Sequence, residues 1–310
     1  MNILISGGFG YIGSYLLQKF VSERHSLGVI SRHTPVCLKG LAKNADVYLS
    51  DVTKPIRVEL KSKYEIFIHL AAANDVESLD PCVALNSTVL GTRNCLDFCI
   101  KNGIKKVIYF STFQVYGTNR GFVNEATDLH CANDYAMTHR FAEEYVEMYR
   151  RNFGLEYIIL RPTNVYGACL HKDIDRWSLV PNCFCKEAIE RQTITLLSSG
   201  RQLRDFISLE DLTNLTVILC GKFNKVKNSV INLAAGRSIS ILDVAQMVKA
   251  SFEKILGTTC ALNIQSSLPR KAERLTVETK RLKGLGYRFD KEYSIEKEIE
   301  RIFCLLKADN

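Results

Sequence analysis

Short apolar runs recur along this chain, separated by segments in which apolar residues return at helical spacing. Each run is bounded by polar or glycine residues and has the length of a buried strand in a parallel sheet. The runs predict strands at Ile3–Ile5, Leu27–Ile30, Val47–Leu49, Ile66–Leu70, Val107–Phe110, Tyr157–Leu160 and Val230–Leu233. Between some of these runs, the spacing predicts helices at 13–22, 86–102 and 133–152.

Alternation of strands with helices is typical of a parallel sheet that is covered by helices on both faces. The two longer helices each carry apolar residues on one face: Val89, Leu96 and Ile100 in the first, and Phe141, Tyr145 and Met148 in the second. After Arg161-Pro162 the alternation becomes irregular, which indicates a smaller second domain in the C-terminal part of the chain.

A glycine-rich turn follows the first predicted strand. Residues 7–13, Gly-Gly-Phe-Gly-Tyr-Ile-Gly, fit G-x-G-x-x-G from Gly8 and also G-x-x-G-x-x-G from Gly7. Such glycines allow a tight turn, a close approach to a pyrophosphate and close packing of the next helix, whose N-terminal N–H groups face the phosphates. An ordinary glycine-rich turn is the alternative, but the flanking strand and helix favour a dinucleotide site.

Together these features predict an α/β chain: a Rossmann-like doubly wound parallel sheet with a smaller α+β C-terminal substrate domain. We expect the dinucleotide-binding domain at 1–165 plus about 204–235. The second domain is expected at 166–203 and 236–310.

Net charge changes this interpretation little. The formal charge is +8, but 33 acidic residues are mixed among 41 basic ones. The densest basic stretch, Arg270 to Lys283, suits a solvated helix face, a site for a polyanionic small molecule or, least well, nucleic acid. We therefore expect no nucleic-acid partner.

The 11 cysteines include no C-x-x-C motif, and no histidine or carboxylate completes a metal set around them. We therefore expect reduced thiols and no metal site. No apolar stretch reaches the roughly 18 to 20 residues that a bilayer span needs. The chain begins directly with a strand and shows no leader, so we expect a cytoplasmic protein without a membrane partner.

A series of further motifs follows the glycine turn. In order, they are Asp51-Val52, His69-Leu-Ala-Ala72, Asn86, Gly91-Thr-x-Asn94, Ser111-Thr112-x-x-Val-Tyr-Gly117, Tyr135, Arg161-Pro-Thr-Asn-Val-Tyr-Gly167, Arg204-Asp-Phe-Ile-Ser-Leu-Glu-Asp211, Asn232-Leu-Ala-Ala-Gly236 and Pro269-Arg270. With this order the chain resembles, over nearly its whole length, the extended short-chain dehydrogenase/reductases that act on nucleotide-linked sugars. That family includes NAD(P)-dependent epimerases, dehydratases and 4-ketoreductases.

The resemblance implies a role for each motif. Thr112 and Tyr135 match a catalytic hydroxyl pair, in which the tyrosine exchanges a proton with the sugar oxygen during hydride transfer. Cofactor contacts are implied for Gly7, Phe9, Gly10, Tyr11, Ile12, Gly13, Asp51, Val52, Leu70, Ala71, Ala72, Asn86, Tyr135, His139 and Pro162. Substrate contacts are implied for Asn74, Thr112, Asn164, Arg204 and Arg270, and the arginines suit a diphosphate. The alternative for Tyr135 is a half-buried helix aromatic without a catalytic role.

The end of the second predicted strand bears on the choice of cofactor. Family members that use NAD usually place a carboxylate there, which binds the ribose hydroxyls and repels a 2′-phosphate. Here the strand ends in Ser31-Arg32, and a hydroxyl followed by a guanidinium suits a 2′-phosphate. We expect NADP(H) to be preferred over NAD(H), unless Arg32 stacks on adenine or points into solvent.

Two departures from the family pattern narrow the reaction. Phe113-Gln114 stand where the family's dehydratases place an Asp-Glu pair, so the acid and the base needed for loss of water are missing. His139 stands where the family nearly always places a lysine, which holds the nicotinamide ribose and favours the phenolate. Histidine is mostly neutral at pH 7, which leaves Tyr135 protonated and favours reduction of a ketone over oxidation of an alcohol.

These departures favour an NADPH-dependent reductase of a keto-sugar nucleotide, most simply a 4-keto-6-deoxy sugar, with Tyr135 as proton donor. The alternative within the family is an NAD-dependent 4-epimerase or a related nucleotide-sugar enzyme. The alternative of another class is a catalytically silent NADP-binding sensor. The resemblance also implies a homodimer through helices 86–102 and 133–152. The base, the sugar and the position of reduction stay open.

Overall fold

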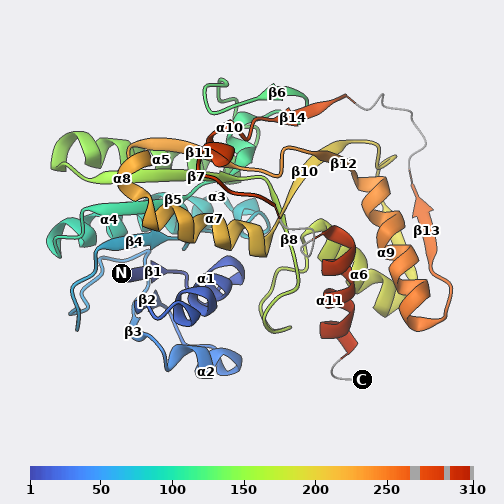
Figure 1. The fold of residues 1–310 in the computed structure, drawn as a ribbon, viewed down its shortest axis with the longest axis horizontal. Helices are drawn as coiled ribbons and strands as arrows, with labels where there is room; N and C mark the ends of the chain where they lie inside the picture. The colour runs from blue at the N-terminus through green and yellow to red at the C-terminus, as the bar shows by residue number, and fades with distance from the viewer. Residues whose placement is uncertain (266–272, 290–293, 308–310) are drawn as a thin grey trace. The chain divides into compact units, whose positions relative to one another are not determined.

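The computed structural model describes residues 1–265, 273–289 and 294–307. The chain divides into two compact units (Figure 1). Unit 1 consists of Met1–Thr118, Glu125–Pro162 and Thr213–Ile231, and unit 2 consists of Asn119–Asn124, Thr163–Leu212 and Asn232–Asn310. Segments 119–124, 163–165, 204–212 and 232–235 thus lie in unit 2, although the sequence-based division placed them with the dinucleotide-binding domain. The function of each domain stays a prediction.

Unit 1 is built on a seven-stranded sheet with the order β11-β7-β5-β4-β1-β2-β3. Its strands are β1 (Asn2–Ser6), β2 (Ser26–Ser31), β3 (Asp46–Leu49), β4 (Ile66–His69), β5 (Lys106–Phe110), β7 (Glu156–Pro162) and β11 (Ser229–Leu233). The pairings from β3 through to β7 are parallel. The seven strands predicted from apolar runs are all present, and the doubly wound parallel sheet is confirmed.

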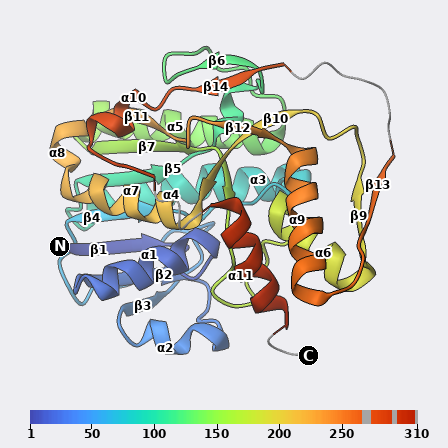
Figure 2. The same cartoon turned by 45° about the vertical axis from the view of Figure 1, so that its right-hand side comes forward.

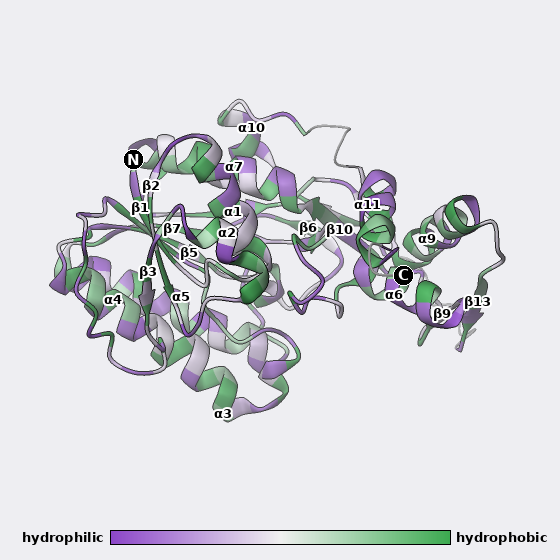
Figure 3. Ribbon diagram, turned by 90° about the horizontal axis from the view of Figure 1, so that it is seen from below, coloured by the Kyte–Doolittle hydropathy of each residue, from purple (hydrophilic) through white to green (hydrophobic). Residues whose placement is uncertain are grey.

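Helices cover both faces of this sheet, as parallel strands buried on both sides require. Figure 3 shows α1 (Tyr11–Ser22) and α7 (Leu209–Gly221) on one face, and α4 (Gly91–Lys101) and α5 (Asp134–Phe153) on the other. Between the sheet and the α4–α5 face lies an apolar core that includes Phe67, Val107 and Ile159. The short elements of unit 1 are η1 (Val36–Leu38), α2 (Lys39–Ala42), η2 (Glu77–Leu79), α3 (Pro81–Ala84), η3 (Leu85–Leu90), η4 (Phe113–Tyr116) and α8 (Phe223–Val226).

The single helix predicted at 86–102 is interrupted. Residues Leu85–Leu90 form a π-helix, and the regular α-helix begins only at Gly91. The Ala73 N–H donates to Thr88 Oγ1 at 3.2 Å and so ties this segment to the chain after β4. The first residue of α4 is also closely packed, because a Cβ on Gly91 would lie 3.2 Å from Val52 Cγ2. The wider π turn is therefore accompanied by tertiary contacts, which the spacing of apolar residues alone cannot reveal.

Unit 2 contains both strands and helices, so the predicted α+β character of this part is confirmed. Its strands are β6 (Gly121–Val123), β8 (Asn164–Tyr166), β9 (Thr193–Leu196), β10 (Leu203–Ser208), β12 (Ser238–Ser240), β13 (Ala261–Ile264) and β14 (Leu275–Val277). The helices α6 (Val180–Arg191), α9 (Ile241–Leu256) and α11 (Ile295–Lys307) pack together around one apolar core (Figure 2), and α10 (Lys280–Gly284) is short.

Two sequence-based expectations concern the whole chain. The 11 cysteines all lie within the described residues, and all of them are free thiols. In the part of the chain that the structure describes, no helix has both the length and the apolar character to cross a membrane.

Candidate active site

The glycine turn joins β1 to α1 in unit 1. Gly7 has a φ of +72°, and a Cβ there would lie 2.9 Å from the backbone N of Ala71. A Cβ on Gly13 would lie 2.2 Å from the Gly7 carbonyl oxygen, so only glycine permits this approach of the helix to the turn. The N-cap of α1 is Gly10, which offers no side-chain cap, so an anion can accept from the first-turn N–H groups. This cradle fits a dinucleotide pyrophosphate.

The other predicted cofactor contacts of unit 1 lie close to the carboxyl ends of its strands, where open α/β sheets bind ligands. Asp51 and Val52 follow β3, Leu70 to Ala72 follow β4, and Pro162 ends β7. Within the glycine turn, Phe9 and Tyr11 are buried and Ile12 is half-buried. Asn86 is exposed in the π-helix η3.

Asp51 is held in one orientation by its neighbour. Its Oδ1 accepts hydrogen bonds from the backbone N–H and the hydroxyl of Thr53, both at 2.9 Å. The Thr53 bonds, together with the charge of Arg32 nearby, lower the pKa of the Asp51 carboxyl. Asp51 is therefore an ionised acceptor, as a contact to an adenine amine would require.

The end of β2 carries no carboxylate. The Ser31 hydroxyl donates to the His33 carbonyl oxygen at 2.8 Å, so its proton is already engaged. Arg32 is exposed and forms no ion pair with any residue that the structure describes. Of the two side chains predicted to favour a 2′-phosphate, only Arg32 therefore offers donors.

The Thr112 turn and the Tyr135 helix are tied together within unit 1. Thr112 is buried two residues after the end of β5, and its Oγ1 accepts from the Gln114 N–H at 3.2 Å. Helix α5 begins next to its N-cap Asn133, whose Oδ1 accepts from the Ala136 N–H and whose Nδ2 donates to Gln114 Oε1 at 3.1 Å. Tyr135 lies half-buried in the first turn of that helix. Gln114 thus serves as a link between the two segments.

His139 lies one helical turn after Tyr135 and is buried. The two rings meet edge to face, with their centroids 4.7 Å apart. Nδ1 of His139 lies 2.7 Å from the hydroxyl of Tyr109 in β5. His139 is predicted from the sequence as a site residue but Tyr109 is not, because nothing in the spacing of residues 109 and 139 predicts that they touch.

A buried ion pair was also missed. Arg161 in β7 donates to both carboxylate oxygens of Glu143 in α5, from Nε at 2.8 Å and from Nη2 at 2.6 Å. The Arg161 guanidinium also lies over the Tyr116 ring, 4.9 Å from its centroid. Burial alone would raise the pKa of Glu143, but the hydrogen bonds and charge of Arg161 hold it below its ordinary value. This pair fastens α5 to the sheet.

The Asn74 side chain has a local role in the structure. Its Oδ1 accepts from the backbone N–H groups of Val76 and Glu77, both at 2.9 Å. The Glu77 carboxylate in turn accepts from the Asn74 N–H at 2.9 Å. This reciprocal cap occupies the side-chain oxygen, so the amide nitrogen of Asn74, a donor, is the side-chain atom left for a substrate.

Unit 2 holds the other predicted substrate contacts. Asn164 in β8 lies on the strand next to Arg204 in β10, and its Nδ2 donates to the Asp205 carbonyl oxygen at 2.9 Å. Arg204 is half-buried, and burial lowers the pKa of its guanidinium. Among the described residues, its Nη1 donates to the Leu203 carbonyl oxygen alone, at 3.0 Å, and no carboxylate pairs with the guanidinium. Arg270 lies outside the described residues.

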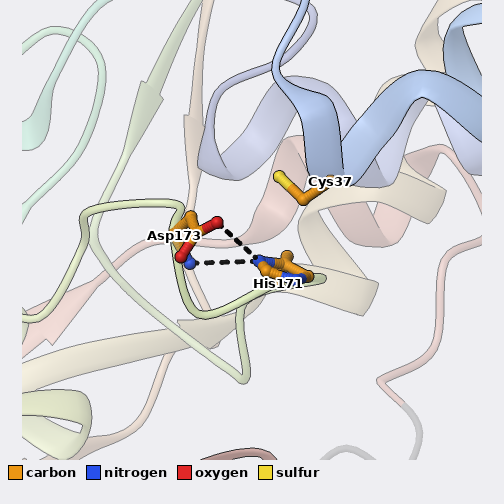
Figure 4. Close-up of side chains that lie close together, drawn as sticks. All are labelled: Cys37, His171 and Asp173. Carbon is orange, nitrogen blue, oxygen red and sulfur yellow. Dashed lines mark hydrogen bonds and ion pairs between the residues drawn. The ribbon is translucent and has the colours of Figure 1, made fainter.

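Figure 4 draws a histidine and a carboxylate that lie close together in unit 2. Nδ1 of His171 lies 3.4 Å from Asp173 Oδ2 and accepts from the Asp173 backbone N–H at 3.2 Å. Cys37, which is also drawn, belongs to unit 1. Unit 2 by itself contributes two possible ligand atoms, one from His171 and one from Asp173.

Comparison with known proteins gives consistent results. A family model described as "NAD dependent epimerase/dehydratase family" matches residues 3–234. The chain is 26% identical over 323 residues to a protein of Methanocaldococcus jannaschii named putative UDP-glucose 4-epimerase, and the match covers 99% of each.

Two solved structures share the fold. The first is a UDP-glucose 4-epimerase of Thermotoga maritima with UDP-glucose, with a TM-score of 0.84, 23% identity and coverage of 100% of this chain and 99% of that one. The second is a UDP-glucuronic acid 4-epimerase of Bacillus cereus with UDP-glucuronic acid and NAD, with a TM-score of 0.82, 23% identity and full coverage of both chains. The family inferred from the motifs is confirmed: this chain is an enzyme of the NAD dependent epimerase/dehydratase family.

Proposed function

We propose that this protein is a nucleotide-sugar 4-epimerase that inverts the hydroxyl at C4 of the sugar. The observation that carries the proposal is the link between the Thr112 turn and the Tyr135 helix, in the same unit as the glycine turn. The relative and the structures described above support an epimerase better than the keto-sugar reductase that the sequence favoured.

The reaction follows from the chemistry of these side chains. A bound nicotinamide nucleotide supplies a reversible hydride acceptor. Tyr135 takes the proton of O4 as hydride leaves C4, and returns it when hydride comes back to the opposite face of the 4-keto sugar. Thr112 orients O4 by a second hydrogen bond. His139 would hold the nicotinamide ribose by donating a hydrogen bond to it, in place of the family lysine.

Loss of water is not part of this proposal. Phe113 is buried against Tyr116, with ring centroids 5.2 Å apart. Gln114 is bonded to Asn133. Neither side chain can act as an acid or a base at neutral pH, so a dehydratase step lacks its usual groups at these positions.

A nucleoside diphosphate sugar is the proposed substrate class. Arg204 is a half-buried cation without a carboxylate partner among the described residues, and burial of an unpaired charge is unfavourable. Two phosphate oxygens would accept its parallel N–H groups. Asn164 on the neighbouring strand, and Arg270 by its motif, are proposed to contact the same diphosphate.

NADP(H) is the proposed preferred cofactor, although NAD is the one bound by the Bacillus cereus structure. Support comes from the missing carboxylate at the end of β2 and from the exposed guanidinium of Arg32.

The protein is further proposed to be a cytoplasmic homodimer. Exposed apolar side chains on α3, η3 and α5 support the dimer, because these three elements pack against one another and present a hydrophobic face.

A keto-sugar reductase is the second candidate, favoured by one observation. His139, one helical turn after Tyr135, is a buried histidine where the family has a lysine. Without the fixed positive charge of a lysine, Tyr135 is ionised less readily, and it is the ionised form that would deprotonate an alcohol. Reduction of a ketone needs only the protonated phenol.

One assay separates the candidates. The purified protein is incubated with UDP-glucose, UDP-galactose and the uronic acid and N-acetyl pairs, and products are followed by NMR. An epimerase forms the C4 epimer without net oxidation or reduction of cofactor, and Tyr135→Phe slows it by on the order of 10². Tyr149→Phe, a buried tyrosine farther along α5, serves as the control. Stoichiometric oxidation of NADPH by a 4-keto-6-deoxy sugar nucleotide would establish the reductase instead.

A further inference from the structure

A row of buried polar side chains crosses unit 1 from the glycine turn to helix α5. Ser6, just before the turn, lies 2.6 Å from His69 Nδ1, and His69 Nε2 lies 3.0 Å from Thr92 Oγ1. The Tyr109 ring lies between two histidines, with centroids 5.6 Å from His69 and 6.0 Å from His139. Such buried groups have defined donors and acceptors, because an unpaired one is costly.

The His69 end of the row can be assigned. The Thr92 hydroxyl donates to the Thr88 carbonyl oxygen at 2.5 Å, so towards His69 it acts as an acceptor. Burial lowers the pKa of His69 to about 3, so the ring is neutral. His69 therefore carries its proton on Nε2, and the Ser6 hydroxyl donates to Nδ1.

The same reasoning applies to Tyr109 and His139. Tyr109 is only 1% exposed, and burial raises the pKa of its phenol well above the usual range. The phenol thus keeps a proton that needs an acceptor. The Thr92 hydroxyl also acts on this phenol, but it is already bonded to the Thr88 carbonyl oxygen and to His69, whereas Nδ1 of His139 lies 2.7 Å from the Tyr109 oxygen. That nitrogen can accept the phenol proton only if it carries no proton of its own. The proton of the imidazole is then on Nε2.

We propose that Tyr109 is a positioning residue that holds His139 as the neutral Nε2–H tautomer. Helix α5 then presents an N–H donor one turn after Tyr135, where the family lysine presents an ammonium group. The use of that donor for the nicotinamide ribose rests on the proposed function. The tautomer itself does not, because it follows from the contacts within unit 1.

The tautomer can be measured without any substitution. The protein is labelled with ¹⁵N at its 6 histidines, and long-range ¹H–¹⁵N spectra are recorded at pH 7. His139→Gln removes one set of signals and so assigns them. We expect His139 with a protonated Nε2 and an unprotonated Nδ1. A protonated Nδ1, in either the other tautomer or the cation, would overturn the proposal.

Removal of the hydroxyl tests the consequence for binding. Tyr109→Phe should weaken nicotinamide nucleotide binding, measured by calorimetry, about tenfold, because His139 loses its fixed tautomer. Tyr149→Phe removes another buried phenol hydroxyl of unit 1 and should change that affinity by less than about twofold. Thermal unfolding of both variants is compared, so a general loss of stability is recognised.

A double-variant cycle shows whether Tyr109 acts through His139. In His139→Gln the side-chain amide Nε2 can donate whether or not residue 109 carries a hydroxyl. Adding Tyr109→Phe to this variant should therefore change the affinity for the nicotinamide nucleotide by less than about twofold. An equal loss in both backgrounds would show a merely structural role for Tyr109 and refute the proposal. If the protein binds nucleotide but epimerises no sugar, the proposed function fails while these binding and tautomer measurements still decide the role of Tyr109.

Discussion

At the residue scale, Arg32 gives the most direct test of cofactor choice. Fluorescence titration should show NADPH bound more tightly than NADH. Arg32→Ala should narrow the ratio of the two affinities about tenfold, because a charge-assisted bond to the 2′-phosphate is lost. Arg151→Ala, which removes an exposed arginine at the end of α5, should leave the ratio unchanged. Equal affinities for NADPH and NADH in the unmodified protein would contradict this prediction.

Single-residue predictions from the sequence are limited by what a motif encodes. The motifs located Thr112, Tyr135 and His139, and all three residues lie in unit 1 of the structure. They could not give the contact of His139 with Tyr109, which depends on how α5 lies against β5. Nor could they give the cap made by Asn74, because a capping asparagine and a ligand-binding asparagine look alike in a sequence.

At the scale of elements, the ion pair of Glu143 with Arg161 fastens α5 to β7. Removal of one partner leaves a buried charge unpaired, so Glu143→Gln should lower the free energy of unfolding at pH 7 by about 3 to 5 kcal/mol. Urea denaturation measures this quantity. Glu144→Gln, at the neighbouring exposed position, should lower it by less than about 1 kcal/mol. A similar decrease in the free energy of unfolding in the two variants would show that the buried ion pair stabilises the fold no more than an exposed carboxylate does.

The same pair predicts a dependence on pH. The pKa of Glu143 in the folded protein lies below its ordinary value of 4.5. Its ionised form therefore stabilises the fold above that pH, and the contribution is lost as the pH falls through the lower, folded-state pKa. Between pH 7 and acid pH, the Glu143→Gln variant should lose less stability than the unmodified protein does.

Elements were predicted more completely than residues, for a physical reason. Strands buried on both faces consist mainly of apolar residues, so β1, β4 and β5 can be read from the sequence within one or two residues. The break at Leu85–Leu90 could not be read, because a π-helix differs from an α-helix by a shift in backbone hydrogen bonds rather than in composition.

At the scale of the whole molecule, the predicted homodimer depends on an apolar helix surface of unit 1. This surface consists of Val83, Leu85, Leu90, Met137 and Phe141. Leu85 is 46% exposed and Phe141 is 44% exposed, although Phe141 was predicted to lie on the apolar face of its helix. Exposed apolar groups on elements that pack against one another are typical of interfaces, and a twofold dimer would bury the same surface on both chains.

Light scattering after size exclusion should therefore give twice the chain mass of 35.1 kDa at micromolar concentration. Phe141→Glu should shift the protein to monomer, because dimerisation would then bury an unpaired carboxylate on each side of the twofold axis. Phe122→Glu, at an exposed phenylalanine of unit 2, is the matched control and should leave the mass unchanged. A monomeric unmodified protein would refute the predicted dimer. A dimer that survives Phe141→Glu would place the contact on another surface, and the exposure of these apolar side chains would then need a different explanation.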